Sequence, residues 1–207
     1  MKKVIPGFII AAIFWFLMFS PWTKDLFNFW VMMLLATTSL NIYSFVKGRN
    51  QLKDVYKFET KWIYIGVIAA AILYLTFYAG NYFSNMLFNF ANHQIENIYA
   101  TKTQADKIFI GAALLLWIGP AEEIFWRGFA QHNLQLEYGE TKGFIITTAI
   151  YAIVHIWAFN FMLFMAALIC GIFWGWMFKK YKSVIPGLIS HAIWDAVIFV
   201  VLPIATR

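Results

Sequence analysis

The chain has 207 residues, of which 62% are hydrophobic and 13% are charged, and its formal net charge is +6. Soluble proteins carry about 25% charged residues, so this composition excludes a soluble globular domain. The positive charge lies in the connections between apolar segments, and no basic helix or aromatic-basic platform indicates a nucleic-acid partner. The single cysteine, Cys170, lies within an apolar segment and is expected to be a packing residue.

Apolar segments of about 20 residues recur along the chain, and such a segment can cross a bilayer as a helix. We predict spans at residues 4–20, 26–46, 62–82, 108–131, 143–159, 161–178 and 184–205. These seven spans predict an all-α, polytopic transmembrane helix bundle that forms a single membrane domain over residues 1–207. Lys2 and Lys3 precede the first span, and no small-residue cleavage site follows it, so we expect it to be retained.

The connections and interruptions of these spans carry further predictions. The polar, asparagine-rich stretch from Phe83 to Lys107 favours an interfacial helix, whereas His132 to Lys142 is expected to be a loop. Gly119-Pro120 and Pro186-Gly187 interrupt the fourth and seventh spans, and a proline inside a helix removes a hydrogen bond and kinks the chain. The small-xxx-small pattern formed by Gly171 and Gly175 predicts close helix packing.

The basic residues are distributed unequally between the two sides of this layout. A cytoplasmic N-terminus and seven alternating spans place most of them in the cytoplasm, as the positive-inside rule requires. The cytoplasmic set comprises Lys2, Lys3, Lys47, Arg49, Lys53, Lys57, Lys61, Lys142, Lys179, Lys180 and Lys182. The outer set comprises only Lys24, Lys102, Lys107 and Arg207.

Ionisable groups inside the spans occur only in the last four of them. They are Glu122, Glu123, Arg127, His155, His191 and Asp195. At about 1.5 Å of rise per residue, Glu122 lies about 14 Å, His155 about 18 Å, His191 about 12 Å and Asp195 about 18 Å from the cytoplasmic end of its span. Charged residues within a membrane are rare and usually face a bundle interior or a water-filled cavity, so this shared layer predicts a functional site.

Helical spacing sorts these groups into pairs. Glu123 and Arg127 are four residues apart and can pair on one face, whereas Glu122 lies about 100° further round the helix and is the free acid. His191 and Asp195 are also four residues apart, and Tyr151 lies one turn before His155. A buried ion-pair network that only fixes helix packing is the alternative interpretation.

These groups could support hydrolysis. A carboxylate taken out of water is a stronger base near neutral pH, so Glu122 could take a proton from a water that His155 also holds. His191 could donate to the oxyanion that forms on the attacked carbonyl, and Asp195 could orient His191 or, if protonated, donate as well.

Two other chemistries use the same residues. His155, His191 and one or two carboxylates could bind zinc, although no HExxH pattern is present. A proton-coupled transporter would also use Glu and His groups, but the ionisable groups lie in one half of the chain and indicate no inverted repeat.

The acidic segment resembles a known family. Glu122-Glu123-xxx-Arg127-Gly128, with Leu134 downstream, is similar to the first motif of the CPBP intramembrane proteases. These include the type II CAAX prenyl endopeptidases and bacterial proteins linked to bacteriocin immunity. The second motif, Phe-xxx-His, is matched by Tyr151-xxx-His155, and the third, His-xxx-Asn or His-xxx-Asp, by His191-xxx-Asp195. The resemblance covers residues 119–195.

The resemblance implies a glutamate-dependent endopeptidase of the cell membrane, expected in the bacterial plasma membrane, with residues 108–205 as its catalytic core. Glu122 and His155 would activate water, His191 and Asp195 would form the oxyanion site, and Glu123 and Arg127 would support them. No metal or other cofactor is expected, and the substrate would be a membrane-embedded or lipid-modified, CAAX-like peptide in contact with the lipid bilayer. A zinc-dependent protease and a non-catalytic immunity or regulatory protein are the alternatives.

This sequence departs from the family at two points. Tyr151 replaces the usual Phe and adds a hydroxyl that could alter the hydrogen bonding of His155. Asp195 is a poorer neutral donor than the Asn found in other members.

Overall fold

The structure, a computed structural model, describes residues 2–204, with the side chains of residues 50–52 left outside the description. It is helical, and these residues contain no strand. The α-helices are α1 (Ile5–Phe19), α2 (Phe29–Val55), α3 (Lys61–Leu87), α4 (Ala91–Tyr99), α5 (Lys107–Ala113), α6 (Gly119–Glu123), α7 (His132–Tyr138), α8 (Glu140–Ile153), α9 (Phe161–Tyr181) and α10 (Ile185–Ala196). The predicted all-α class is therefore correct.

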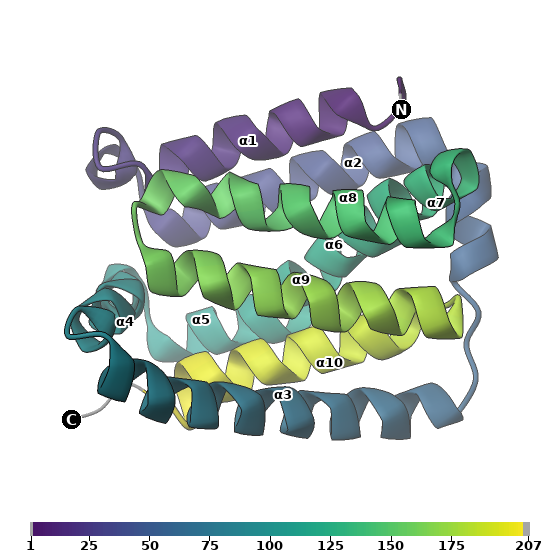
Figure 1. The fold of residues 1–207 in the computed structure, drawn as a ribbon. Helices are drawn as coiled ribbons and strands as arrows, with labels where there is room; N and C mark the ends of the chain where they lie inside the picture. The colour runs from purple at the N-terminus through teal and green to yellow at the C-terminus, as the bar shows by residue number, and fades with distance from the viewer. Residues whose placement is uncertain (1, 205–207) are drawn as a thin grey trace.

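Five helical stretches of the described chain are long and apolar enough to cross a membrane. They are Phe29–Arg49, Lys61–Leu87, Lys107–Tyr138, Glu140–Ala158 and Phe161–Tyr181. Two shorter apolar helices, Ile5–Phe19 and Ile185–Val201, lie where we predict the first and last spans. The start of α1 and the end of the helical stretch that follows α10 lie at opposite ends of the bundle (Figure 1). The count of seven and the cytoplasmic N-terminus stay predictions.

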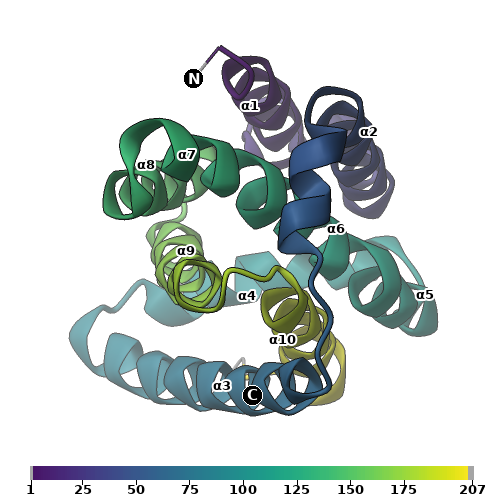
Figure 2. The same ribbon diagram turned by 90° about the vertical axis from the view of Figure 1, so that its right-hand side faces the viewer.

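Viewed along the bundle, α1 and α2 lie on one side and α3 lies on the other, with α6, α9 and α10 between them (Figure 2). Half of the largest fully buried side chains are aromatic, and they include Trp15, Trp126 and Trp174. α4 forms the helix predicted within the polar stretch 83–107.

The predicted loop between His132 and Lys142 is wrong. α7 continues the preceding helix as far as Tyr138, and Gly139, at φ 85°, forms the turn into α8. A Cβ at Gly143 would lie 2.4 Å from the backbone nitrogen of Gln135, so α7 and α8 contact each other through their backbones. Only glycine at both positions allows so tight a hairpin.

The predicted break at Pro186-Gly187 is wrong as well, because Pro186 lies in the first turn of α10. A proline there removes no intrahelical hydrogen bond. The helix continues as a π-helical stretch and ends at Val201. The predicted end of this span, at 205, lies outside the described residues.

Gly171 and Gly175 pack as predicted. A Cβ at Gly171 would lie 3.2 Å from side-chain atoms of Thr148 and Tyr151, and one at Gly175 would lie 2.8 Å from the ring of Phe144. The two glycines therefore bring α9 close to α8 and place Tyr151 next to the carboxylates described below.

Candidate active site

The acidic segment lies on an irregular helix. α6 is flanked by two π-helical stretches, Leu114–Ile118 and Ile124–Gln131. Pro120 has no N–H to donate to the preceding turn, and the wider π turn accommodates that loss. Such π-helical turns occur frequently at functional sites.

Neighbouring helices hold α6 in place. A Cβ at Gly119 would lie 2.9 Å from the Cα of Ala192, so α6 and α10 touch through their backbones. On the other side, the Asn41 side chain of α2 donates a hydrogen bond of 2.9 Å to the carbonyl of Ala121. These contacts bring Glu122 and Glu123 next to the α10 segment that carries His191.

Glu123 is the centre of a buried ion cluster. Its Oε1 atom accepts a hydrogen bond of 2.8 Å from Nη1 of Arg127, so the pair predicted from the i,i+4 spacing is present. The same oxygen lies 3.0 Å from Nδ1 of His191. The Glu123 and Arg127 side chains are each only 1% exposed, so water screens this interaction very little. Arg127 also donates to the carbonyl of Cys170 at 3.4 Å.

His191 lies between two carboxylates. While Nδ1 faces Glu123, Nε2 lies 3.4 Å from Oδ2 of Asp195, whose side chain is 16% exposed. The indole of Trp174 stacks on the imidazole with ring centroids 3.7 Å apart and itself donates to Ser190. The stacking fixes the plane of the ring, so the orientation of both nitrogens is determined by the protein.

Glu122 has a different partner from Glu123. Its Oε2 atom accepts a hydrogen bond of 3.2 Å from the hydroxyl of Tyr151. Glu122 is buried, with only 5% of the residue exposed. The extra hydroxyl of Tyr151 therefore acts on Glu122, and not on His155 as the sequence suggested.

His155 contacts the backbone of the same tyrosine. Its Nδ1 atom lies 2.8 Å from the carbonyl oxygen of Tyr151, at the point where α8 passes into the 3₁₀-helical stretch Val154–Ala158. The other ring nitrogen, Nε2, accepts a hydrogen bond of 3.0 Å from the indole of Trp15. Among the hydrogen bonds of residues 2–204, none joins Glu122 directly to His155.

The expected site residues thus form one connected cluster. His155, Tyr151 and Glu122 make one branch, and Arg127, Glu123, His191 and Asp195 make the other. The guanidinium of Arg127 joins the two branches, because it lies 4.7 Å from the ring centroid of Tyr151.

Trp15 and Trp174 contact the two histidines, and the sequence did not indicate either of them. Each is one aromatic residue among many in an apolar segment, and its position carries no motif. Cys170, in contrast, is buried as predicted, and only its backbone carbonyl contacts the cluster.

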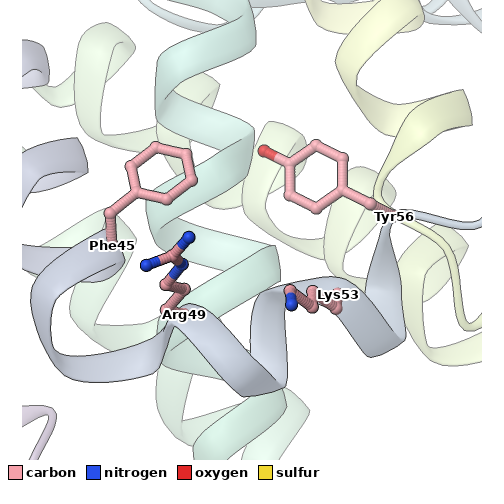
Figure 3. A pocket seen from close by; sticks show the side chains of 4 residues that line it. All are labelled: Phe45, Arg49, Lys53 and Tyr56. Atoms are coloured by element: carbon pink, nitrogen blue, oxygen red, sulfur yellow. The ribbon is translucent and has the colours of Figure 1, made fainter.

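A separate cavity of about 350 Å³ lies near the C-terminal end of α2. Figure 3 shows its lining residues, Phe45, Arg49, Lys53 and Tyr56, of which the first three come from α2. No residue of the cluster lines it, so this cavity is distinct from the candidate active site.

Comparison with known proteins finds one matching family. Residues 103–197 match the family model of type II CAAX prenyl endopeptidase Rce1-like proteins, and this range contains every site residue predicted from the sequence. No curated protein and no solved structure matches the chain. The matched family is a protease family, and with the long apolar helices it indicates a multi-pass membrane protein. This match supports a relationship of residues 103–197 to the CPBP/CAAX protease family.

Proposed function

We propose that the protein is a glutamate-dependent intramembrane endopeptidase that hydrolyses a peptide bond of a membrane-associated substrate. The observation that carries this proposal is the buried cluster of two glutamates and two histidines around Arg127. Charged groups buried in an apolar bundle are costly unless they are paired, and membrane proteins retain them mainly where they act.

In this proposal Glu122 is the general base. It takes a proton from water, the resulting hydroxide attacks the carbonyl carbon of the peptide bond, and a tetrahedral oxyanion forms. The C–N bond then breaks, and the proton held by Glu122 passes to the leaving amine. Tyr151 supports this role because its hydroxyl orients the Glu122 carboxyl group.

The second branch of the cluster would stabilise the oxyanion. Glu123 and Trp174 fix the ring of His191, which leaves the Nε2 side, next to the partly exposed Asp195, as the side from which the ring can donate to substrate. Preorganised donors of this kind are among the largest contributions to catalysis. His155 would assist Glu122 in binding the water, and Arg127 would hold Glu123.

The substrate class follows from the family and from the apolar surface. We propose a membrane-embedded or lipid-modified, CAAX-like peptide that enters from the lipid bilayer, and a cell-membrane location in which the basic end of the bundle faces the cytoplasm. We propose that this membrane is the bacterial plasma membrane.

A proteomic comparison of membrane peptides tests this function. Membranes that contain the wild-type protein are expected to yield cleavage products that membranes with the Glu122→Ala variant lack. Glu59→Gln, a variant of an exposed glutamate, is the control and should give the wild-type products. Identical peptides from wild-type and Glu122→Ala membranes, together with an unchanged phenotype of the host, would favour a non-catalytic immunity or regulatory role.

Removal of metal ions is expected to leave peptide cleavage unchanged. Each ring nitrogen of His155 and of His191 is already next to a protein group, and no group of three or more His, Cys, Asp or Glu side chains in residues 2–204 is arranged to hold a metal ion. The measurement is the cleavage rate after exhaustive chelation and dialysis. A rate that falls and returns with added zinc would establish the zinc-dependent alternative.

A further inference from the structure

The hydrogen bonds of His155 define the state of its ring. The carbonyl oxygen of Tyr151 can only accept, so the Nδ1 atom that lies 2.8 Å from it carries the proton. In the neutral ring Nε2 then has a lone pair and no proton. Nε2 is therefore the atom through which His155 could accept a proton or a hydrogen bond from water.

Nε2 of His155 already accepts a hydrogen bond from a residue of α1. The indole Nε1–H of Trp15 is a donor only, and it lies 3.0 Å from Nε2 of His155. Nε2 offers a single lone pair in the plane of the ring. While Trp15 donates to it, water cannot donate to the same atom, so the structure holds His155 in a state that is closed to water.

Trp15 is held at this position by aromatic neighbours. It is fully buried, and its ring makes edge-to-face contacts with Trp126, the neighbour of Arg127 on the acidic helix, and with His155 itself. The opposite side of α1 is open, because Ile9 and Ile13 are more than half exposed. α1 thus lies at the edge of the bundle (Figure 2), where it can shift with few contacts to break on its outer side.

We propose that Trp15 holds the place of the hydrolytic water at His155, and that it leaves Nε2 when substrate and water enter. This inference rests on the proposed peptidase function. It makes α1, which lies outside the matched residues 103–197, a part of the reaction site. Trp15 is a positioning residue, since it acts on the reaction through His155.

The test removes the indole donor and measures cleavage. The substrate is a fluorogenic peptide built on the cleavage site found in the proteomic comparison. Trp15→Phe is expected to raise kcat about two- to tenfold, the factor that corresponds to the net strength of a buried hydrogen bond. Replacement of Trp15 by 3-benzothienylalanine, which keeps the shape and lacks the N–H, should have the same effect if Trp15→Phe folds poorly.

Trp30→Phe is the matched control. Trp30 is also buried, and its indole donates over the same 3.0 Å, but to the carbonyl of Thr101, so its loss should leave kcat unchanged. Nitrogen NMR of ring-labelled histidine provides a readout independent of cleavage, and the Nε2 signal of His155 should shift in Trp15→Phe and stay in Trp30→Phe.

The outcomes separate the two proposals. A lower kcat in both Trp15 variants, with cleavage by the wild-type protein intact, overturns the inference and leaves the peptidase function standing. An unchanged Nε2 signal in Trp15→Phe overturns it too. Absence of any cleavage by the wild-type protein contradicts the proposed function, and this inference falls with it.

Discussion

Replacement of Glu122 by Gln is expected to lower kcat for peptide cleavage by a factor of about 10² to 10⁴, which is the usual contribution of a general base. The amide has nearly the shape of the carboxyl group, and its oxygen can still accept the hydrogen bond from Tyr151. It cannot take a proton from water. The loss should therefore appear in kcat, with KM little changed, because substrate binding does not require the charge.

The measurement is steady-state cleavage by purified wild-type and variant protein in the same lipid or detergent. Tyr151→Phe is an informative companion, since it removes only the hydroxyl that orients Glu122, and it should reduce kcat much less than Glu122→Gln. The exposed variant Glu59→Gln serves as the control. A Glu122→Gln protein with kcat near that of the wild type would show that another group takes the proton.

The architecture could be predicted because the bilayer constrains it. Apolar runs of fixed length mark helices in a membrane protein, and all the helices that carry the site lie within the predicted segments or extend them. The error at residues 132–142 arose because a polar composition was interpreted as a loop. Asn133 is buried and donates to the carbonyl of Phe129, so its polarity is satisfied inside the helix that the sequence did not indicate.

Local spacing predicted the contacts that lie within one helix. Arg127 pairs with Glu123, and Asp195 lies next to His191, because side chains four residues apart share a helical face. Shared depth predicted that the helices bring their ionisable groups together. Depth carries no information on rotation about the helix axis, so the sequence could not decide which group faces which.

The contacts that decide the roles join distant parts of the chain. Glu123 contacts His191, which lies 68 residues further along the chain. Trp15 contacts His155, which lies 140 residues further along. Nothing in the composition of α1 distinguishes Trp15 from the other aromatic residues of that helix. A site whose ligands come from separate helices therefore requires the packed structure, even where a motif already names most of its members.

Replacement of Arg127 by Met is expected to destabilise the fold by about 3–5 kcal/mol, since it removes one partner of a buried ion pair. Met has a similar length and can fill much of the volume, so the loss is mainly electrostatic. Glu123 would keep only His191 as a partner, and the carbonyl of Cys170 would lose its donor. Oε2 of Glu123, which faces Gly187, already lacks a hydrogen-bond partner among the described residues.

The double variant Glu123→Gln, Arg127→Met decides whether the pair itself is responsible. Removing the charge on both sides leaves no unpaired carboxylate, so the double variant should be more stable than Arg127→Met alone. If the two residues were independent, the two losses of unfolding free energy would add, and the double variant would be the less stable of the two. The measurement is the unfolding midpoint in a denaturant titration of the purified protein. Lys61→Met, which breaks the exposed pair with Glu59, is the control and should change the midpoint far less. A double variant less stable than Arg127→Met would show that Glu123 stabilises the bundle mainly through His191.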